Sequence, residues 1–408
     1  MTPDAVDETQ LSSVAQALLK SVSELVSDPD QRVYVVMDGS QFDDLPKLFK
    51  AANVFHRPLY RYAGGDYAII VGGPWLIDPY QAALPATTDQ RMVDEGADDI
   101  SDEELEAHSA ALSAQMVASL EAGDPTGGGM LPVDAGHAPA LVIERLRHVV
   151  KLTDGKPAAV FWSGASSLSS EHLYKHLRGL NRISVPKVWK DNQPTHEGPR
   201  VRNEEEFTAA GEDAPLEDLT NGGQEMVIFR HADANVMMQT IPALDEVQLA
   251  RLFGPATQLI FAPDLVWGGG VKRARHAANI KPPLGALQFD PAAMQVMSAA
   301  RLEVSRQRVM AYLREADPEN NKLSDADLRK KTLFYELDGK EMGLRSEGAH
   351  ARWAFLMSST DGQIGQEQDI RKAVKTSADP DQTLAEIMDG MVRIGQSEIQ
   401  GKRISGSS

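Results

Sequence analysis

The stretch RVYVVMDG, residues 32–39, predicts the first strand of a buried sheet. β-Branched and aromatic side chains fill it and a glycine ends it, which is the pattern of a strand covered on both faces. Helical patterns lie on either side. Residues 8–26 repeat Leu and Val at helical spacing, and in DDLPKLFKAA either Asp43 or Asp44 is placed to cap a helix with Pro46 in its first turn. We therefore expect helices packed around this strand.

Strand and helix patterns alternate from here to residue 264. The expected strands are residues 66–80, 157–164, 181–189, 225–233 and 257–264. Helices are expected between them, and Ser167 or Ser169 is placed to cap the one that begins near residue 170. Within the segment 66–80, we expect the strand to stop at Gly72 and Gly73, and we expect Pro74 to exclude ladder pairing there.

The remaining segments complete the predicted architecture. Acidic insertions are expected near residues 91–137 and 191–223, residues 268–283 read as a basic loop, and the sequence from about residue 285 is helical throughout. We predict an α/β fold: a mixed sheet with flanking helices in an N-terminal lobe, residues 1–284, followed by an all-helical C-terminal lobe, residues 285–408, with a flexible C-terminal tail.

Methionine is frequent in the predicted helical lobe. Because its side chain adapts to irregular apolar partners, a Met-bearing lobe suits a peptide-binding groove, although ordinary core packing explains the same residues. We expect the methionines of this set, Met342 among them, to be exposed. The candidates for binding are Met294, Met297, Met310, Trp353, Met357, Met388 and Met391.

The composition of the chain limits the kinds of partner and site that it can have. The 408 residues carry a net charge of −18, which disfavours nucleic acid and anionic membrane surfaces as partners of the whole chain. The chain contains no cysteine, so disulfides, thiolate metal sites and cysteine nucleophiles are excluded. The start shows no secretory signal pattern, and no apolar run approaches spanning length, so a soluble, cytoplasmic protein is expected.

The common catalytic motifs are missing from the sequence. His172 and His176 share a helix face, but a metalloprotease helix needs Glu directly after the first histidine, where this chain has Leu173. WSGASS lacks the nucleophile elbow, and neither a phosphate-binding loop nor a dinucleotide fingerprint is present. We therefore predict no catalytic residue, cofactor or metal, and a binding protein rather than an enzyme. A metal-dependent hydrolase using His172, His176 and a distant carboxylate remains the alternative.

Five segments occur in an order that resembles a known family. They are VYVVMDGSQFDDLPKLF, GGPWLID, HLRGLNRISVPKV, VIFRHAD and LDEVQLARLFGPATQLI, and LRSEGAHARWAFLM follows them. In this order they are similar to the effector chaperones of bacterial type VI secretion (Tap/Tec-type), over about residues 32–391. Two positions depart from that pattern: Ala234 stands where Pro is frequent, and Gly179 replaces Arg.

The resemblance implies an adaptor that binds a toxic effector, in particular its N-terminal segment, and helps load it onto the VgrG spike. We expect the helical lobe to grip the effector, in a groove between the lobes, and the α/β lobe to serve as the platform. Arg178 and Arg230 are expected to be structural, with Arg178 bridging to Asp233 or to a strand-end carbonyl. An immunity-type inhibitor of the same effector remains open, since it would also bind the effector. The framework residues that the resemblance implies are Asp38, Pro74, Trp75, His176, Leu177, Arg178, Phe229, Arg230, Asp233, Phe253, Gly254 and Pro255.

Overall fold

The structure, a computed structural model, describes residues 11–52, 54–60, 67–83, 132–134, 138–187, 223–276 and 280–405. Two compact units divide the chain. Unit 1 comprises residues 1–186 and 223–297, and unit 2 comprises residues 187–222 and 298–408. The boundary falls after Met297, inside a long helix, whereas the sequence placed it at residue 284. The expected class is confirmed: a sheet with flanking helices, followed by a helical C-terminal region.

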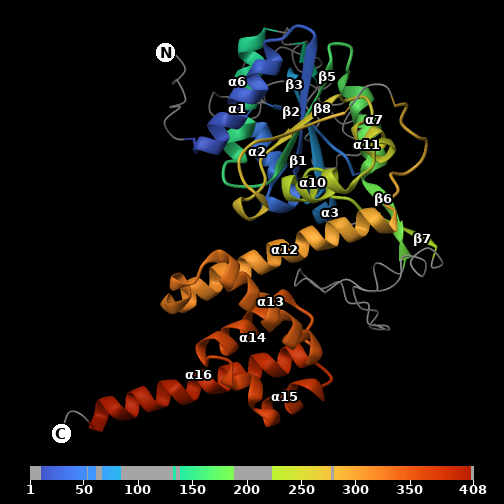
Figure 1. The fold of residues 1–408 in the computed structure, drawn as a ribbon. Coiled ribbons are helices and arrows are strands. Elements are labelled where there is room, and N and C mark those ends of the chain that lie inside the picture. The colour runs from blue at the N-terminus through green and yellow to red at the C-terminus, as the bar shows by residue number, and fades with distance from the viewer. Residues whose placement is uncertain are drawn as a thin grey trace. The chain divides into compact units, whose positions relative to one another are not determined.

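A seven-stranded sheet forms the centre of unit 1 (Figure 1). Its strands lie in the order β2–β3–β1–β5–β8–β9, and β4 pairs with β3. A mixed sheet was expected, but every ladder between these strands is antiparallel. The strands are β1 (Gln31–Asp38), β2 (Val54–Pro58), β3 (Pro74–Ala83), β4 (Pro132–Asp134), β5 (Ala159–Ala165), β8 (Gln258–Phe261) and β9 (Lys272–Arg275).

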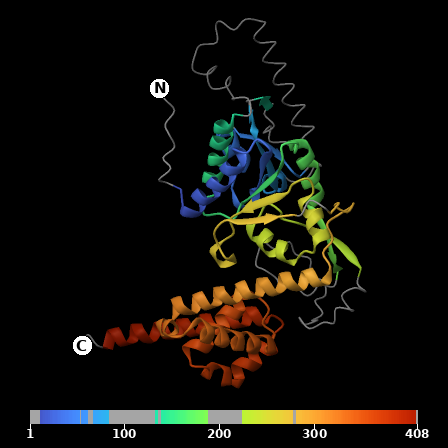
Figure 2. The ribbon, with the colours of Figure 1, turned by 45° about the horizontal axis from the view of Figure 1, so that its top comes forward.

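Helices cover both faces of this sheet. In Figures 1 and 2, α1 and α6 lie side by side against one face, and α7 and α11 lie on the other. Val33, Val35 and Val36 of β1 are fully buried between these layers, which explains why the strand is apolar on both faces. The helices of unit 1 are α1 (Ser13–Val26), α2 (Leu45–Ala51), α3 (Tyr67–Val71), α6 (Pro139–Leu152), α7 (Ser170–Leu180), α10 (Ala234–Thr240) and α11 (Glu246–Phe253).

The segment around Pro74 differs from its prediction. Residues 67–71 form helix α3, and the strand begins at Pro74, where it was expected to stop. Proline is tolerated there because the first residue of a strand can lack an N–H without losing a ladder bond, and the Pro74 carbonyl still accepts the Leu59 N–H at 2.8 Å. Trp75 is fully buried within the sheet, and its Nε1–H donates to the Val71 carbonyl at 3.2 Å.

Other departures concern short strands. β2 was not predicted, and β9 lies inside the segment that was expected to be a basic loop. The strands β6 (Arg182–Pro186) and β7 (Gln224–Ile228) form a separate two-stranded sheet. Both predicted acidic insertions fall almost entirely outside the described residues, and β4 is a described strand within the first of them.

Most local signals are confirmed. Asp44 caps α2 by accepting the Lys47 N–H, and Ser169 caps α7 by accepting the His172 N–H. Strand β8 and helices α6, α7 and α11 fall within the segments predicted for them, and β1 and β5 each extend one residue beyond theirs. These elements carry their signal in a few consecutive residues, which is why the sequence alone places them.

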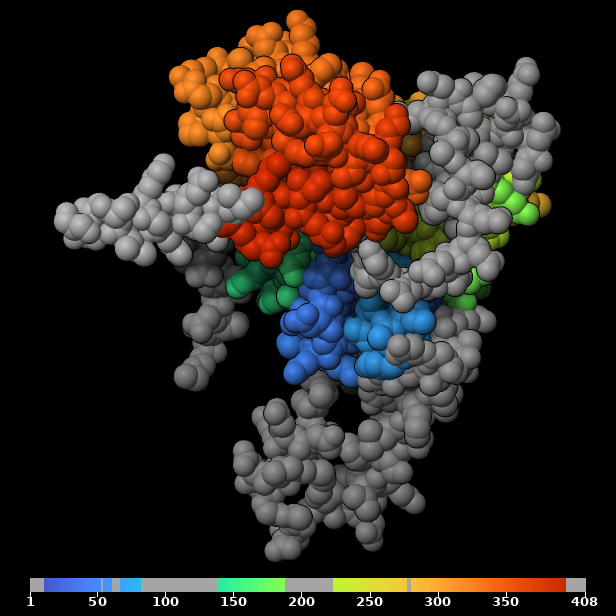
Figure 3. All heavy atoms as spheres, turned by 90° about the horizontal axis from the view of Figure 1, so that it is seen from below, coloured from blue at the N-terminus to red at the C-terminus, as the bar shows by residue number. Residues whose placement is uncertain are grey.

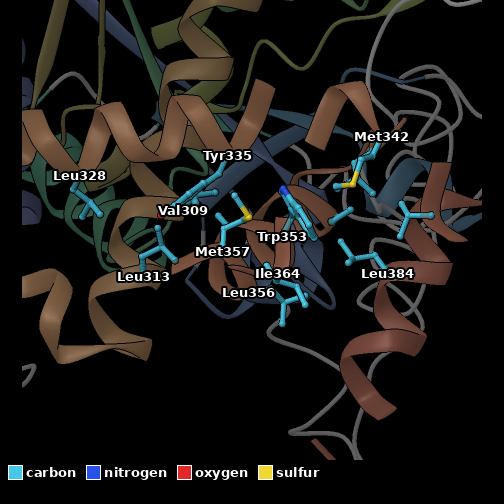
Figure 4. Packing of buried hydrophobic residues seen from close by; sticks show 14 residues of the cluster. Val309, Leu313, Leu328, Tyr335, Met342, Trp353, Leu356, Met357, Ile364 and Leu384 are labelled. Carbon is cyan, nitrogen blue, oxygen red and sulfur yellow. The ribbon is translucent and has the colours of Figure 1, made fainter. Parts of the chain in front are cut away.

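Unit 2 is a helical bundle with its own core. Trp353 and Met357 from α14 point into the centre of this core, beside Tyr335 (Figure 4). On the face shown in Figure 3, the orange and red surface of the bundle is continuous. The helices are α12 (Pro291–Ala316), α13 (Asp325–Glu341), α14 (Glu347–Ser359), α15 (Gln368–Lys375) and α16 (Pro380–Ser405).

Charged pairs fix the helices of unit 2 around the core. The Arg306 guanidinium donates twice to the Glu336 carboxylate, at 2.7 and 3.2 Å. Asp338 accepts both the Trp353 Nε1–H at 2.9 Å and the Arg371 guanidinium at 2.7 Å. Such bidentate and shared bonds set the direction of each helix more than they add to stability. Within the described ranges, no helix is both long enough and apolar enough to cross a bilayer.

Candidate functional site

Residues from three of the resemblance motifs meet at the end of β1. Asp38 is the last residue of β1, Arg230 follows β7, and Asp233 caps α10. The Arg230 Nη2 lies 2.5 Å from Asp38 Oδ2 and 3.3 Å from Asp233 Oδ2, and it also donates to Ser40 Oγ at 2.9 Å. In the register of β1 and β3, Asp38 is paired with Pro74, which belongs to the third motif. We call Asp38, Ser40, Arg230 and Asp233 the Asp38 cluster.

The electrostatics of the Asp38 cluster indicate a structural role. Both carboxylates are nearly buried, whereas the arginine is about half exposed (49%). Burial raises the pKa of Asp233, and the charge of Arg230 and the N–H groups of Asn235 and Val236 counteract that rise. The guanidinium bonds both carboxylates, so neither is presented as a free general base.

A second cluster joins two of the resemblance motifs, HLRGLNRISVPKV and LDEVQLARLFGPATQLI. The His176 Nε2–H donates to the Leu252 carbonyl at 2.9 Å, and the ring packs edge-on against Trp162 of β5. Gly254 has a φ of +54°, and a Cβ atom placed there would lie 2.2 Å from His176 Cε1. Glycine is therefore required both by the backbone and by the close approach of the imidazole. We call His176, Trp162 and Gly254 the His176 cluster.

Burial keeps His176 neutral. It lowers the pKa of the imidazole to about 4, and the nearby Arg251 and His172 charges act in the same direction. His172, by contrast, is exposed at the surface of α7. The Nε2 of His176 is already bonded to the Leu252 carbonyl, so this nitrogen is not free to bind a metal ion. In the part of the chain that the structure describes, no group of three or more His, Asp or Glu side chains is placed to hold a metal ion.

Sequence reasoning missed His231. Its ring is fully buried and packs edge-on against Trp162, with Nε2 3.0 Å from Asn181 Oδ1, and burial lowers its pKa to about 3. The only sequence signal was its place in FRHAD, between Arg230 and Asp233. The two histidines around Trp162 are therefore neutral and tightly packed, and they connect the sheet to the helices.

The remaining framework residues are mostly core. Leu177 and Phe253 are fully buried, Phe229 is 3% exposed, and Pro255 follows Gly254 in the turn that leads into β8. The prediction for Arg178 was wrong. Its guanidinium lies 5.6 Å from the centre of the Tyr174 ring, whereas Asp233 is bonded by Arg230 and by backbone N–H groups.

The methionines of the helical region do not form an exposed surface. Met342 and Met357 are buried in the core of unit 2 together with Trp353, and Met294 is only 6% exposed in unit 1. Met310 and Met391 pack against the same core of unit 2, while Met297 and Met388 are partly exposed. The expectation of exposure was thus wrong for most of this set, because a helical periodicity does not tell which face packs inward.

A different set of apolar side chains reaches the surface. On unit 1, Met226 is 51% and Ile228 65% exposed, both on β7. On unit 2, Phe334 is 59% and Leu337 60% exposed, one helical turn apart on α13. The sequence signal for the first pair was the alternation in β7, and for the second the paired aromatic residues Phe334 and Tyr335, of which only Tyr335 enters the core.

The chain was compared with protein-family models, with curated proteins and with solved structures, and none of the three comparisons finds a match.

Proposed function

We propose that this protein is a cytoplasmic adaptor of bacterial type VI secretion, which binds a toxic effector through its N-terminal segment, keeps it soluble, and helps load it onto the VgrG spike. The proposal starts from the ordered motifs that resemble the effector chaperone family. It assigns the protein no reaction and no cofactor. Its activity is to bind an apolar segment that would otherwise aggregate in water.

The observation that carries the proposal is the convergence of the motifs. Asp38 and Arg230 are 192 residues apart and form an ion pair, and His176 and Leu252 are 76 residues apart and form a hydrogen bond. Residues of separate motifs thus contact one another in the folded chain. Here they build the joints of one framework, which supports reading them together as the signature of one family.

The binding surface is assigned to exposed apolar side chains instead of the methionines first considered. Phe334 and Leu337 lie at positions i and i+3 of α13, so they present one apolar face, as helix-to-helix recognition requires. The net charge of −18 keeps a chaperone with an apolar cargo in solution. The same charge attracts a basic toxin domain, which strengthens the encounter.

Surface variants test this assignment without disturbing the fold. The double variant Phe334→Ser/Leu337→Ser is expected to co-purify at least tenfold less of a candidate effector from a neighbouring gene. Val392→Ser, on α16 and 48% exposed, is the matched control and should retain wild-type binding. Equal recovery with all three proteins would show that α13 does not bind the effector.

A toxicity assay separates an escort from an inhibitor. The effector is produced in a sensitive bacterium with and without this chain, and growth is scored beside soluble effector yield. An escort raises the yield of active, toxic effector. An immunity protein abolishes toxicity at unchanged yield, and that result would contradict the adaptor function.

A further inference from the structure

One edge of strand β7 is not paired with any strand that the structure describes. The strand pairs with β6 along the other edge, and β6 is covered in turn by the chain before α12. There the Ser184 N–H donates to the Leu287 carbonyl and the Ser184 carbonyl accepts the Phe289 N–H, both at 2.9 Å. Among the described residues, no strand pairs with the far edge of β7. Within these described residues, a short row of backbone donors and acceptors at this edge is therefore left for another strand to pair with.

The register shows which residues face this edge. The Phe229 N–H donates to the Asn181 carbonyl at 3.0 Å, and in an antiparallel ladder such pairs recur at every second residue. Val227 is thus directed toward β6, whereas the N–H and C=O groups of Gln224, Met226 and Ile228 point away from it. The side chains of these three outward residues are also the exposed ones of the strand.

The edge strand β9 of the seven-stranded sheet offers a comparison. In β9 the His276 N–H donates to the Thr257 carbonyl at 3.1 Å, so by the same alternation Arg273 and Arg275 face outward. Both arginines are exposed, and charged side chains are the usual protection of an edge strand against pairing with other chains. The outward positions of β7 carry no charge and include two large apolar side chains, 51% and 65% exposed. The β9 edge is thus protected by charge, and the β7 edge is not.

We propose that β7 is a docking edge for an extended, predominantly apolar segment of another polypeptide, which adds a third strand to the β6–β7 sheet. Backbone bonds to Gln224, Met226 and Ile228 hold this segment, and the two apolar side chains select apolar residues at alternate positions. The inference rests on the proposed function, because the segment is that of the effector. It names a second mode of recognition, by strand pairing on unit 1.

A second copy of this chain fits the edge less well. Two molecules that each carry a net charge of −18 repel one another. A strand of five residues is also short for a dimer, because its pairing alone buries far less than the ~1,200 Å² of a stable interface. An extended segment of a larger client needs only the strand pairing, since the rest of the client binds elsewhere.

Proline substitution tests the edge directly. Met226→Pro removes an N–H that points away from β6, so the β6–β7 ladder keeps its bonds. Arg273→Pro on β9 is the matched control, since it removes an outward N–H from the protected edge. A second variant, Met226→Lys/Ile228→Lys, keeps every N–H but gives β7 the kind of charge that β9 carries. Each protein is co-expressed with the same candidate effector, and co-purified effector, thermal unfolding and molar mass are measured.

The expected result is an at least tenfold loss of co-purified effector with both β7 variants, near-wild-type recovery with Arg273→Pro, and unchanged thermal unfolding of unit 1. If wild type and both β7 variants recover the effector equally, the docking edge is wrong while the adaptor function stands. If the wild type recovers no effector, the adaptor function fails and the inference fails with it. A wild-type dimer that becomes monomeric in both β7 variants would assign the edge to a second copy and overturn the proposal.

Discussion

Replacement of Gly254 by alanine is the sharpest test of the framework. The glycine has a φ of +54°, a conformation that L-residues rarely adopt, and its missing side chain makes room for the His176 ring. Alanine at this position must strain the backbone and push the imidazole away from the Leu252 carbonyl. We expect unit 1 to be strongly destabilised.

The two penalties can be sized separately. Holding a non-glycine residue in such a conformation costs about 1–3 kcal/mol. A Cβ atom 2.2 Å from His176 Cε1 must displace a ring that is packed against Trp162, and overpacking of this kind costs about 1–3 kcal/mol. The free energy of unfolding of unit 1 should therefore fall by about 4 kcal/mol.

Gly155→Ala is the matched control. Gly155 has a φ of +75°, but a Cβ atom added there would meet no other atom within 4 Å, so this variant carries the backbone penalty without the clash, and we expect a loss of only about 1–2 kcal/mol. Urea unfolding followed by tryptophan fluorescence measures both. In a double-mutant cycle, Gly254→Ala should cost less when His176 is already alanine. Equal losses for the two glycine variants, with no coupling to His176, would refute the close-packing account.

Three further predictions concern the core, the buried histidine and the Asp38 cluster. Trp353→Ala should lower the stability of unit 2 by about 3–5 kcal/mol, while Phe334→Ala changes it by less than about 0.5 kcal/mol; calorimetry that shows equal effects would contradict the assignment of core and surface. Burial lowers the pKa of His231 to about 3, so the folded state binds its proton less tightly and stability is lost as pH falls below about 6.5. Between pH 6.5 and 4.5, the free energy of unfolding of the wild type should fall by about 2 kcal/mol more than that of His231→Gln. Equal losses for the two proteins in urea unfolding would contradict this prediction. Arg230→Ala leaves two nearly buried carboxylates without their cation, and should cost about 1–2 kcal/mol at pH 7, since the arginine is half exposed. The cost should be smaller at pH 4, because burial raises the pKa of Asp233 and this carboxyl group then binds a proton.

Local patterns of the sequence predicted much of the fold. The apolar run of β1 and the caps Asp44 and Ser169 each have their cause within a few neighbouring residues, and all were placed correctly. The segment before Pro74 was not, because its short apolar run suits a helix or a strand equally and only packing decides. β9 has just four residues and becomes a strand through its pairing with β8.

The candidate site was less predictable, for the same reason. The spacing of Asp38 and Arg230 in the chain contains no sign that they pair, and the partner of Arg178 was wrongly chosen among several charged residues. Burial of Met342, Met357 and Trp353 depends on how the helices of unit 2 face one another. Periodicity identifies an apolar face, but the three-dimensional packing decides whether that face lies inside the core or at the surface.

The adaptor function is tested most directly by the solubility of its client. A candidate effector from a neighbouring gene would be produced alone and together with this chain, and the fraction that remains in the supernatant after high-speed centrifugation would be measured for both. Our account predicts that the effector precipitates alone and remains soluble in a stable complex with this protein. Equal solubility in the two cases, with no complex on gel filtration, would contradict the proposed function.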